Sequence, residues 1–437
     1  MESTIIAIPD GEKITPKEKK KFQLSVRPII SHLREKKIHF PPFPIISNLK
    51  DKNSKNNMRK LIHCVKVGVA LVLVSLLYLL DPLYKQVGDN AMWAIMTVIV
   101  IFEFSAGATL GKGLNRGMGT ILGGGLGCSA AAVAQEIGGV GNAIIVGTLV
   151  FMFGAVATYV RLVPSIKKRY DYGVMIFLLT FNLVVVSGIR AEKIMELARD
   201  RLLTIAMGFA VCISVSFIVL PQWSSDELHD SMASKFEDLA SIIEGCLKEY
   251  FEFDSEKDNE QPSGTFSACK AVLNSKSKDE SLANFAKWEP WHGRFGFSYP
   301  WDRYLKTGEV LRELAAIILS LKGCLQSSRQ PLTSVRQSIK EPCEEVGSSL
   351  VWTLRELGES IMKMRKCQPG SQIVSKLKTM RVELHLVISR SKIAPLENGD
   401  ELAIASFLFL FKEVVEKVQE LVKEVEELGE VAEFHTH

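Results

Sequence analysis

The stretch Trp93–Arg116, WAIMTVIVIFEFSAGATLGKGLNR, decides the fold class of this sequence. Its first eighteen residues are almost wholly apolar. A helix rising about 1.5 Å per residue needs roughly 20 such residues to cross about 30 Å of hydrocarbon. Glu103 stands in the middle of this run, where an ionisable side chain costs about 3 kcal/mol. Lys112 and Arg116 follow four residues apart at its end. A membrane helix with a buried acid and two cations at its mouth predicts a pathway for a charged solute.

The composition of the whole chain indicates a membrane half joined to a soluble half. Apolar residues make up 47% of the 437 residues and concentrate between Leu61 and Leu220. Residues 1–60 carry 14 Lys and Arg against 6 Asp and Glu, and they lack the short apolar core of a secretory signal. We therefore expect a basic flexible arm over 1–60, a membrane domain over 61–221 and a cytosolic helical domain over 222–437.

Hydropathy predicts six membrane-spanning helices. The expected spans are Leu61–Leu80, Ala91–Leu110, Gly117–Gln135, Asn142–Val160, Tyr172–Gly188 and Leu202–Leu220. The third span is rich in Gly and Ala rather than Leu, and Gly119, Gly123 and Gly127 form a stripe at a spacing of four. Gly107 and Gly111 share that spacing in the second span. Small residues at this spacing let helix backbones approach closely in lipid.

Basic residues in the loops predict that both termini lie in the cytosol. Arg161 ends the fourth span on the cytosolic side, and Arg190 ends the fifth span on the opposite side. Arg190 and Lys193 lie in a connection where this rule does not expect cations. Either these cations act at the outer mouth of the pathway, which we prefer, or the fifth and sixth spans are assigned to the wrong residues.

After Pro221 the apolar residues recur at helical spacing. We expect helices at Leu228–Tyr250, Trp301–Leu325, Ser334–Met364, Ile373–Ser389 and Glu401–Leu428. The predicted fold class is thus an all-α membrane protein, with six transmembrane helices followed by a cytosolic helical domain.

Five cations are candidates for an anion pathway: Lys66, Lys112, Arg116, Arg161 and Arg190. Cations at several depths attract an anion without trapping it. The alternative is that each cation anchors a helix end at the interface, which is common. Glu103 would repel anions if it were ionised in the pore. We expect it to form a structural ion pair with Lys66, Arg161 or Arg190 rather than to couple protons.

The soluble half contains the hexapeptide WEPWHG, Trp288–Gly293. Glu289 and His292 could suggest catalysis, but no nucleophile, second acid or metal-ligand spacing accompanies them. Pro290 and Gly293 favour a turn, and Trp288 supplies large apolar area. We expect a structural clamp between the two halves. No catalytic residue, metal or cofactor is predicted, and the protein is not expected to be an enzyme.

The sequence also resembles a known family. WAIMTVIVIFEFSAGATLGKGLNR and GTILGGGL (Gly119–Leu126) are similar to the signature of plant aluminium-activated malate transporters, and WEPWHG is similar to the WEP-type motif that follows their membrane domain. The resemblance implies a homodimeric, gated plant channel for malate and possibly other organic or inorganic anions, in the plasma membrane or, as the alternative, the vacuolar membrane. Two other functions stay open: a proton-coupled exporter of organic or aromatic acids using Glu103, and a non-conducting membrane scaffold.

Overall fold

The computed structural model describes most of the chain beyond the basic arm. Every regular element among the described residues is an α-helix, which confirms the all-α prediction for that part of the chain. The chain divides into two units, Met1–Lys60 and Leu61–His437, so the predicted membrane and cytosolic domains lie within one unit. Residues 1–51, Arg190 and most of Ile373–Ser389 lie outside the described residues. The described ranges are 52–80, 91–137, 139–188, 194–251, 263–296, 299–325, 333–366, 375, 377–379, 382 and 398–435.

Four described helices are long and apolar enough to cross a membrane, where six spans were expected. The described helices that precede Pro221 are α2 (Lys52–Leu79), α4 (Ala91–Ile101), α5 (Ala106–Ile137), α6 (Gly139–Leu162), α7 (Pro164–Gly188) and α8 (Ile194–Ile218). The four candidate spans are Ala106–Ile137, Gly139–Leu162, Arg169–Ser187 and Arg199–Ile218. Helix α4 is apolar but has only 11 residues.

The prediction of a flexible arm up to residue 60 was wrong at its end. Helix α2 already begins at Lys52, although residues 52–60 are polar and basic. Once the apolar residues after Leu61 form a helix, each preceding residue adds a backbone hydrogen bond at little entropic cost, and this segment contains no Pro or Gly to stop it.

The predicted second span, Ala91–Leu110, was also wrong, because the helix ends at Ile101 and a new one begins at Ala106. Ser105 caps the new helix: its Oγ accepts a hydrogen bond from the Ala108 N–H at 3.2 Å. The Glu103 N–H donates to Thr109 Oγ1 at 3.0 Å, and the Ala106 N–H donates to the carbonyl of Gln222 at 2.9 Å. Glu103 therefore lies in a short non-helical segment, and the apolar run is two helices with a capped break between them.

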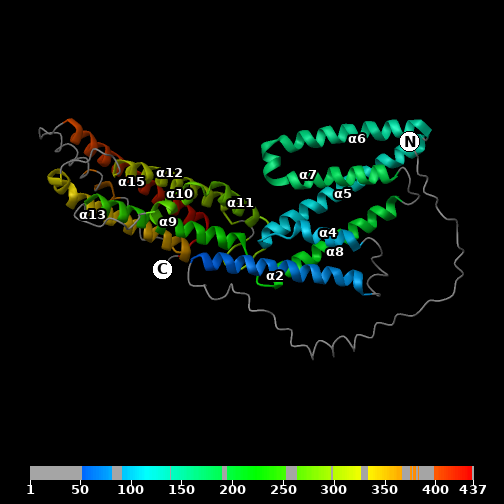
Figure 1. Cartoon of the computed structure of the whole chain (residues 1–437), viewed down its shortest axis with the longest axis horizontal. Helices are drawn as coiled ribbons and strands as arrows, with labels where there is room; N and C mark the ends of the chain where they lie inside the picture. The colour runs from blue at the N-terminus through cyan, green and yellow to red at the C-terminus, as the bar shows by residue number, and fades with distance from the viewer. Residues whose placement is uncertain are drawn as a thin grey trace, which may run out of the picture. The chain divides into compact units, whose positions relative to one another are not determined.

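Helix α5 packs closely against α7 through its glycine stripe. A Cβ added at Gly119 would lie 2.4 Å from the carbonyl oxygen of Gly173, and one at Gly123 would lie 2.6 Å from that of Phe177. Real Cβ atoms do not approach other atoms so closely, so only glycine permits this helix spacing at both positions. Helix α6 runs antiparallel to α7, and a tight turn at Val163 joins the two helices (Figure 1).

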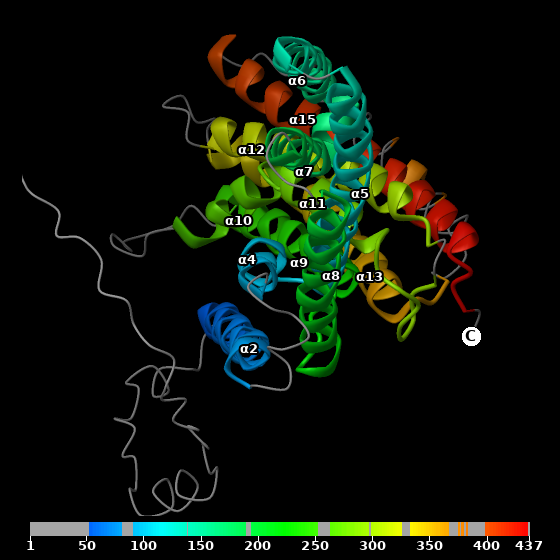
Figure 2. The same ribbon diagram turned by 90° about the vertical axis from the view of Figure 1, so that its right-hand side faces the viewer.

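The helices after Pro221, in the half predicted to be soluble, form a bundle around one apolar core (Figures 1 and 2). Phe236, Leu311, Leu354 and Val418 are fully buried there. Helix α12 has the predicted bounds, and α9 and α15 extend the predicted helices by a few residues. Helix α13 begins and ends one residue before the predicted helix, whereas α10 and α11 were not predicted. The helices are α9 (Ser224–Phe251), α10 (Ser263–Leu273), α11 (Lys276–Ala286), α12 (Trp301–Leu325), α13 (Thr333–Lys363) and α15 (Asn398–Val431).

Candidate functional site

Arg116 is a buried cation on a candidate span. It lies on α5, and only 6% of its surface is exposed. One guanidinium nitrogen donates to the hydroxyl of Tyr172 on α7 at 3.1 Å, while Nε is buried without a hydrogen-bond partner among the described residues. No described carboxylate forms an ion pair with it. A neutral hydroxyl does not compensate the charge, so the site favours an anion.

Lys112 lies one turn before Arg116 on the same helix, and its situation differs. Its Nζ hydrogen-bonds and ion-pairs with the carboxylate of Glu103 in the non-helical segment before α5. Both side chains are about one third exposed, at 38% and 34%. Glu103 thus has a cation partner, but none of the three that we expected. The pair neutralises much of the Lys112 charge.

The remaining predicted cations lie apart from Arg116 in the sequence and on other helices. Lys66 on α2 is 1% exposed, and no ion pair joins it to a described carboxylate. Arg161, at the end of α6, binds both carboxylate oxygens of Asp171 at 2.8 and 3.1 Å. Its charge is therefore compensated within the chain. Arg190 lies outside the described residues.

Sequence reasoning missed the partner of Arg116. Tyr172 is 56 positions away in the chain, so no local pattern could reveal the pair. Arg201 was expected in the connection before the sixth span, but it lies within α8, and its guanidinium stacks 5.0 Å from the ring of Trp93 on α4. Trp93 and Arg201 are also far apart in the sequence, so no local pattern indicates this contact.

A second group of residues joins the start of α5 to the start of α9. We call Ser105, Ser224, Ser225, Glu289 and His292 the junction cluster. Glu289 accepts hydrogen bonds from the backbone N–H groups of Ser224 at 2.6 Å and Ser225 at 3.1 Å, and from the Ser225 hydroxyl at 2.6 Å. The Ser224 hydroxyl donates to that of Ser105 at 2.6 Å. The carboxylate of Glu289 therefore caps α9, whose N-terminus favours negative charge.

Burial raises the pKa of the Glu289 carboxyl, while its hydrogen bonds from the two serines oppose that shift. His292 Nε2 lies 2.9 Å from the Ser225 hydroxyl oxygen, and its Nδ1 lies 2.8 Å from the Pro290 carbonyl. The imidazole also stacks on Trp223, with 3.8 Å between ring centroids. Every polar atom of this ring has a fixed neighbour.

The WEPWHG turn also contacts α5 through two glycines. A Cβ at Gly107 would lie 2.7 Å from Glu289 Cγ, and one at Gly111 would lie 3.1 Å from the Trp288 ring. Arg169 at the start of α7 stacks on the other side of this motif, 5.2 Å from the Trp288 ring centre. Gly293 has a φ of +51°, a conformation that glycine adopts readily.

The junction cluster does not have the form of an active site. Ser225 is fully buried, and its hydroxyl donates to Glu289 within the cluster, so it is not accessible to a substrate as a nucleophile. Among the described residues, no group of three His, Cys, Asp or Glu could hold a metal ion. The cluster is suited to holding helices together.

Comparison with known proteins matches these features to one family. The profile described as "Aluminium activated malate transporter" covers residues 52–396. Aluminum-activated malate transporter 12 of Arabidopsis thaliana is 47% identical over 315 residues, which are 72% of this chain and 56% of that protein. Aluminum-activated malate transporter 14 of the same plant is 46% identical over 322 residues, 73% of this chain and 59% of that protein. Aluminum-activated malate transporter 2 is 38% identical over 383 residues, 87% of this chain and 76% of that protein.

The chain thus spans less than two thirds of the length of the first two relatives. The match nevertheless includes α2 to α13, with both Arg116 and the junction cluster. The family consists of transporters and channels rather than enzymes, in agreement with the sequence prediction. The predicted resemblance is confirmed, and the chain belongs to the aluminium-activated malate transporter family.

Proposed function

We propose that this chain forms a gated channel that conducts malate, and other organic or inorganic anions, across a plant membrane. The observation that carries the proposal is Arg116: a buried guanidinium on a candidate span whose described partner is the neutral hydroxyl of Tyr172. An uncompensated charge in a membrane interior is costly. An anion in the pathway gains the attraction of this guanidinium in place of the water it has lost. The anion in turn offsets part of the cost of the uncompensated positive charge.

Malate suits such a site because both of its carboxylates, with pKa values near 4, are ionised at neutral pH. Lys66 on α2 supplies a second buried cation without a described ion-pair partner. Lys112 and Arg161 are neutralised by Glu103 and Asp171, so they contribute less attraction to the pathway. The predicted cations that the structure describes therefore differ in how strongly they attract an anion, and we expect Arg116 to attract it most.

The junction cluster supports gating as part of the same proposal. Glu289 and Trp288 touch α5 at Gly107 and Gly111, and Gly111 is five residues before Arg116. A movement of the soluble helices would thus reach the helix that carries the cation. We further propose a homodimer in the plasma membrane with both termini in the cytosol; the alternative location is the vacuolar membrane.

Voltage-clamp recording in a heterologous cell, with malate as the sole permeant cytosolic anion, tests the proposal. We expect Arg116→Gln to reduce the malate current strongly at equal surface expression, and Arg161→Gln to reduce it less. Arg355→Gln, in the soluble half and paired with Glu237 and Glu244, is the matched control and should leave the current unchanged. A wild-type current that survives Arg116→Gln would contradict this pathway, and the absence of any wild-type current at the surface would favour the membrane scaffold.

A further inference from the structure

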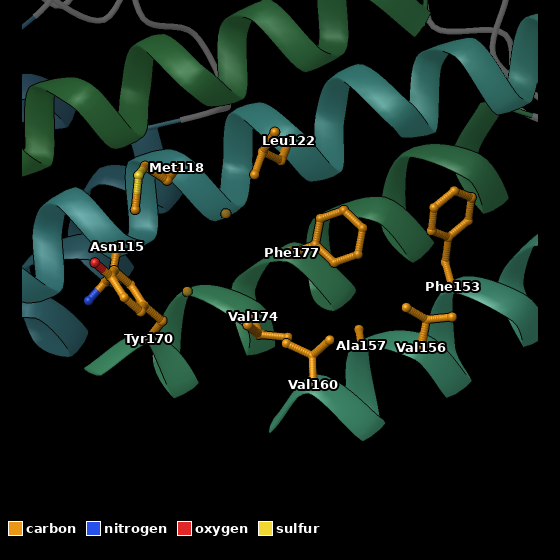
Figure 3. A pocket seen from close by; sticks show the side chains of 12 residues that line it. Asn115, Met118, Leu122, Phe153, Val156, Ala157, Val160, Tyr170, Val174 and Phe177 are labelled. Carbon is orange, nitrogen blue, oxygen red and sulfur yellow. The ribbon is translucent and has the colours of Figure 1, made fainter. Parts of the chain in front are cut away.

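A cavity of about 390 Å³ lies between α5, α6 and α7, beside the contact of Gly119 with Gly173 and Phe177. Figure 3 shows Phe153 and Phe177 toward one end and Asn115 and Tyr170 at the other. Apart from Asn115 and Tyr170, all of its lining residues are apolar. The surface that the cavity offers to a ligand is wholly apolar, so such a site takes an apolar ligand.

The cavity opens toward the surface where lipid would lie. Leu122 of α5 and Val156 of α6 line it, and they are 59% and 56% exposed. All three helices that form the cavity contain candidate spans. Hydrocarbon chains therefore surround its mouth in a bilayer.

Two cations lie on α7 close in sequence to Tyr170, at one end of the cavity. Lys167 and Arg169 lie in the first turns of α7, both are exposed, and neither forms an ion pair with a described carboxylate. The guanidinium of Arg169 lies 5.4 Å from the ring centre of Tyr170, which lines the cavity. Arg161 is close in sequence but is already paired with Asp171.

We propose that this groove binds an anionic phospholipid of the surrounding bilayer. One acyl chain lies against Phe153 and Phe177, and the phosphate lies at Lys167 and Arg169. The charged headgroup of such a lipid would lie at the cations, and its acyl chain would lie along the apolar lining of the groove. Basic pockets between membrane helices bind anionic headgroups by this arrangement. A helix from a second copy would fill the apolar part but would not by itself supply an anionic group to the two cations.

The full-length protein in detergent micelles tests the proposal, with the unfolding temperature followed as lipid is added. Phosphatidylglycerol is the probe, and phosphatidylcholine and glycerol 3-phosphate are compared with it. Val156→Trp fills the groove from an exposed position, and Val140→Trp makes the same change at an 80% exposed position outside it on α6. Lys167→Gln and Arg169→Gln remove the charges, and Arg199→Gln, whose side chain is 68% exposed, is their control.

We expect phosphatidylglycerol to raise the unfolding temperature more than phosphatidylcholine does, and glycerol 3-phosphate to have no effect. Each lost charge should raise the half-saturating phosphatidylglycerol concentration about fivefold. Val156→Trp should abolish the shift, while Val140→Trp and Arg199→Gln keep it. Equal shifts with both lipids, or a wild-type response in Val156→Trp, would overturn the proposal. So would a Val156→Trp protein that loses its dimer but keeps its lipid response, because the groove would then be a protein interface.

Discussion

Replacing Gly119 by alanine tests whether the close packing of α5 on α7 holds the candidate anion site together. The added Cβ would lie 2.4 Å from the Gly173 carbonyl oxygen, 3.0 Å from the Phe177 nitrogen and 3.1 Å from Ile176 Cβ. Two of these atoms belong to the backbone, so no side-chain rotation relieves the contact. An ordinary contact begins at 3.4 Å, so the two helices must separate locally by about 1 Å.

The cost follows from two opposing terms. Alanine gains about 0.5–1 kcal/mol over glycine in a helix interior. Overpacking a close interface costs about 1–3 kcal/mol, and backbone contacts place this site at the upper end. We therefore expect Gly119→Ala to lose about 2 kcal/mol of stability. The same separation would stretch the 3.1 Å hydrogen bond between Arg116 and Tyr172 beyond hydrogen-bonding distance, so the malate current should fall as well.

Gly117→Ala is the matched control, because a Cβ at Gly117 meets no atom within 4 Å. Gly117→Ala should gain the stability that alanine adds in a helix interior, without a steric contact with α7. The two variants should then differ in unfolding temperature by about 5–10 °C in detergent, at about 2–4 °C per kcal/mol. Wild-type malate current is expected only for Gly117→Ala. Equal unfolding temperatures and currents for both variants would refute the reasoning that α5 and α7 touch through this glycine.

Three further predictions concern Glu289, His229 of α9 and Glu103. Glu289→Gln should destabilise the full chain by about 2 kcal/mol, because one carboxylate oxygen becomes a donor facing donors at the start of α9; unchanged thermal unfolding would contradict the cap. Burial lowers the pKa of His229, so the unfolded chain takes up a proton near its ordinary pKa of 6.5 while the folded chain does not. Stability should thus fall as pH drops below about 6.5, and His229→Gln should remove that part of the pH dependence; identical pH profiles of unfolding for both proteins would disprove it. Glu103→Gln should leave the pH dependence of the malate current unchanged if its pair with Lys112 is structural, whereas a lost pH dependence would favour the proton-coupled exporter.

The helices of the soluble half show how far local patterns reach. Helix α12 has the predicted bounds, Trp301–Leu325, because its apolar residues recur at a period that only a helix places on one face. The break between α4 and α5 escaped the same reasoning. Hydropathy averages over a window and does not register a single serine, yet Ser105 starts α5 through its cap and its contact with Ser224.

The candidate site was predictable by residue type but not by partner. Hydropathy and spacing identified Glu103 as an unusual charge within an apolar run and Arg116 as a cation at the end of that run. Glu103 bonds to a cation nine residues away across a helix break, and Arg116 bonds to Tyr172 on another helix. Which residue becomes the partner depends on the path of the chain between helices, and the periodicity of apolar residues does not predict that path.

The sequence by itself determined the all-α class, the apolar half and the glycine stripe, because helical period and hydropathy are properties of neighbouring residues. Only the tertiary structure decided which cations keep their charge uncompensated. Arg161 meets Asp171 and is neutralised, whereas Arg116 meets a hydroxyl and is not. The difference arises from which helix faces pack together, since the strength of a buried charge depends on its nearest neighbours in space.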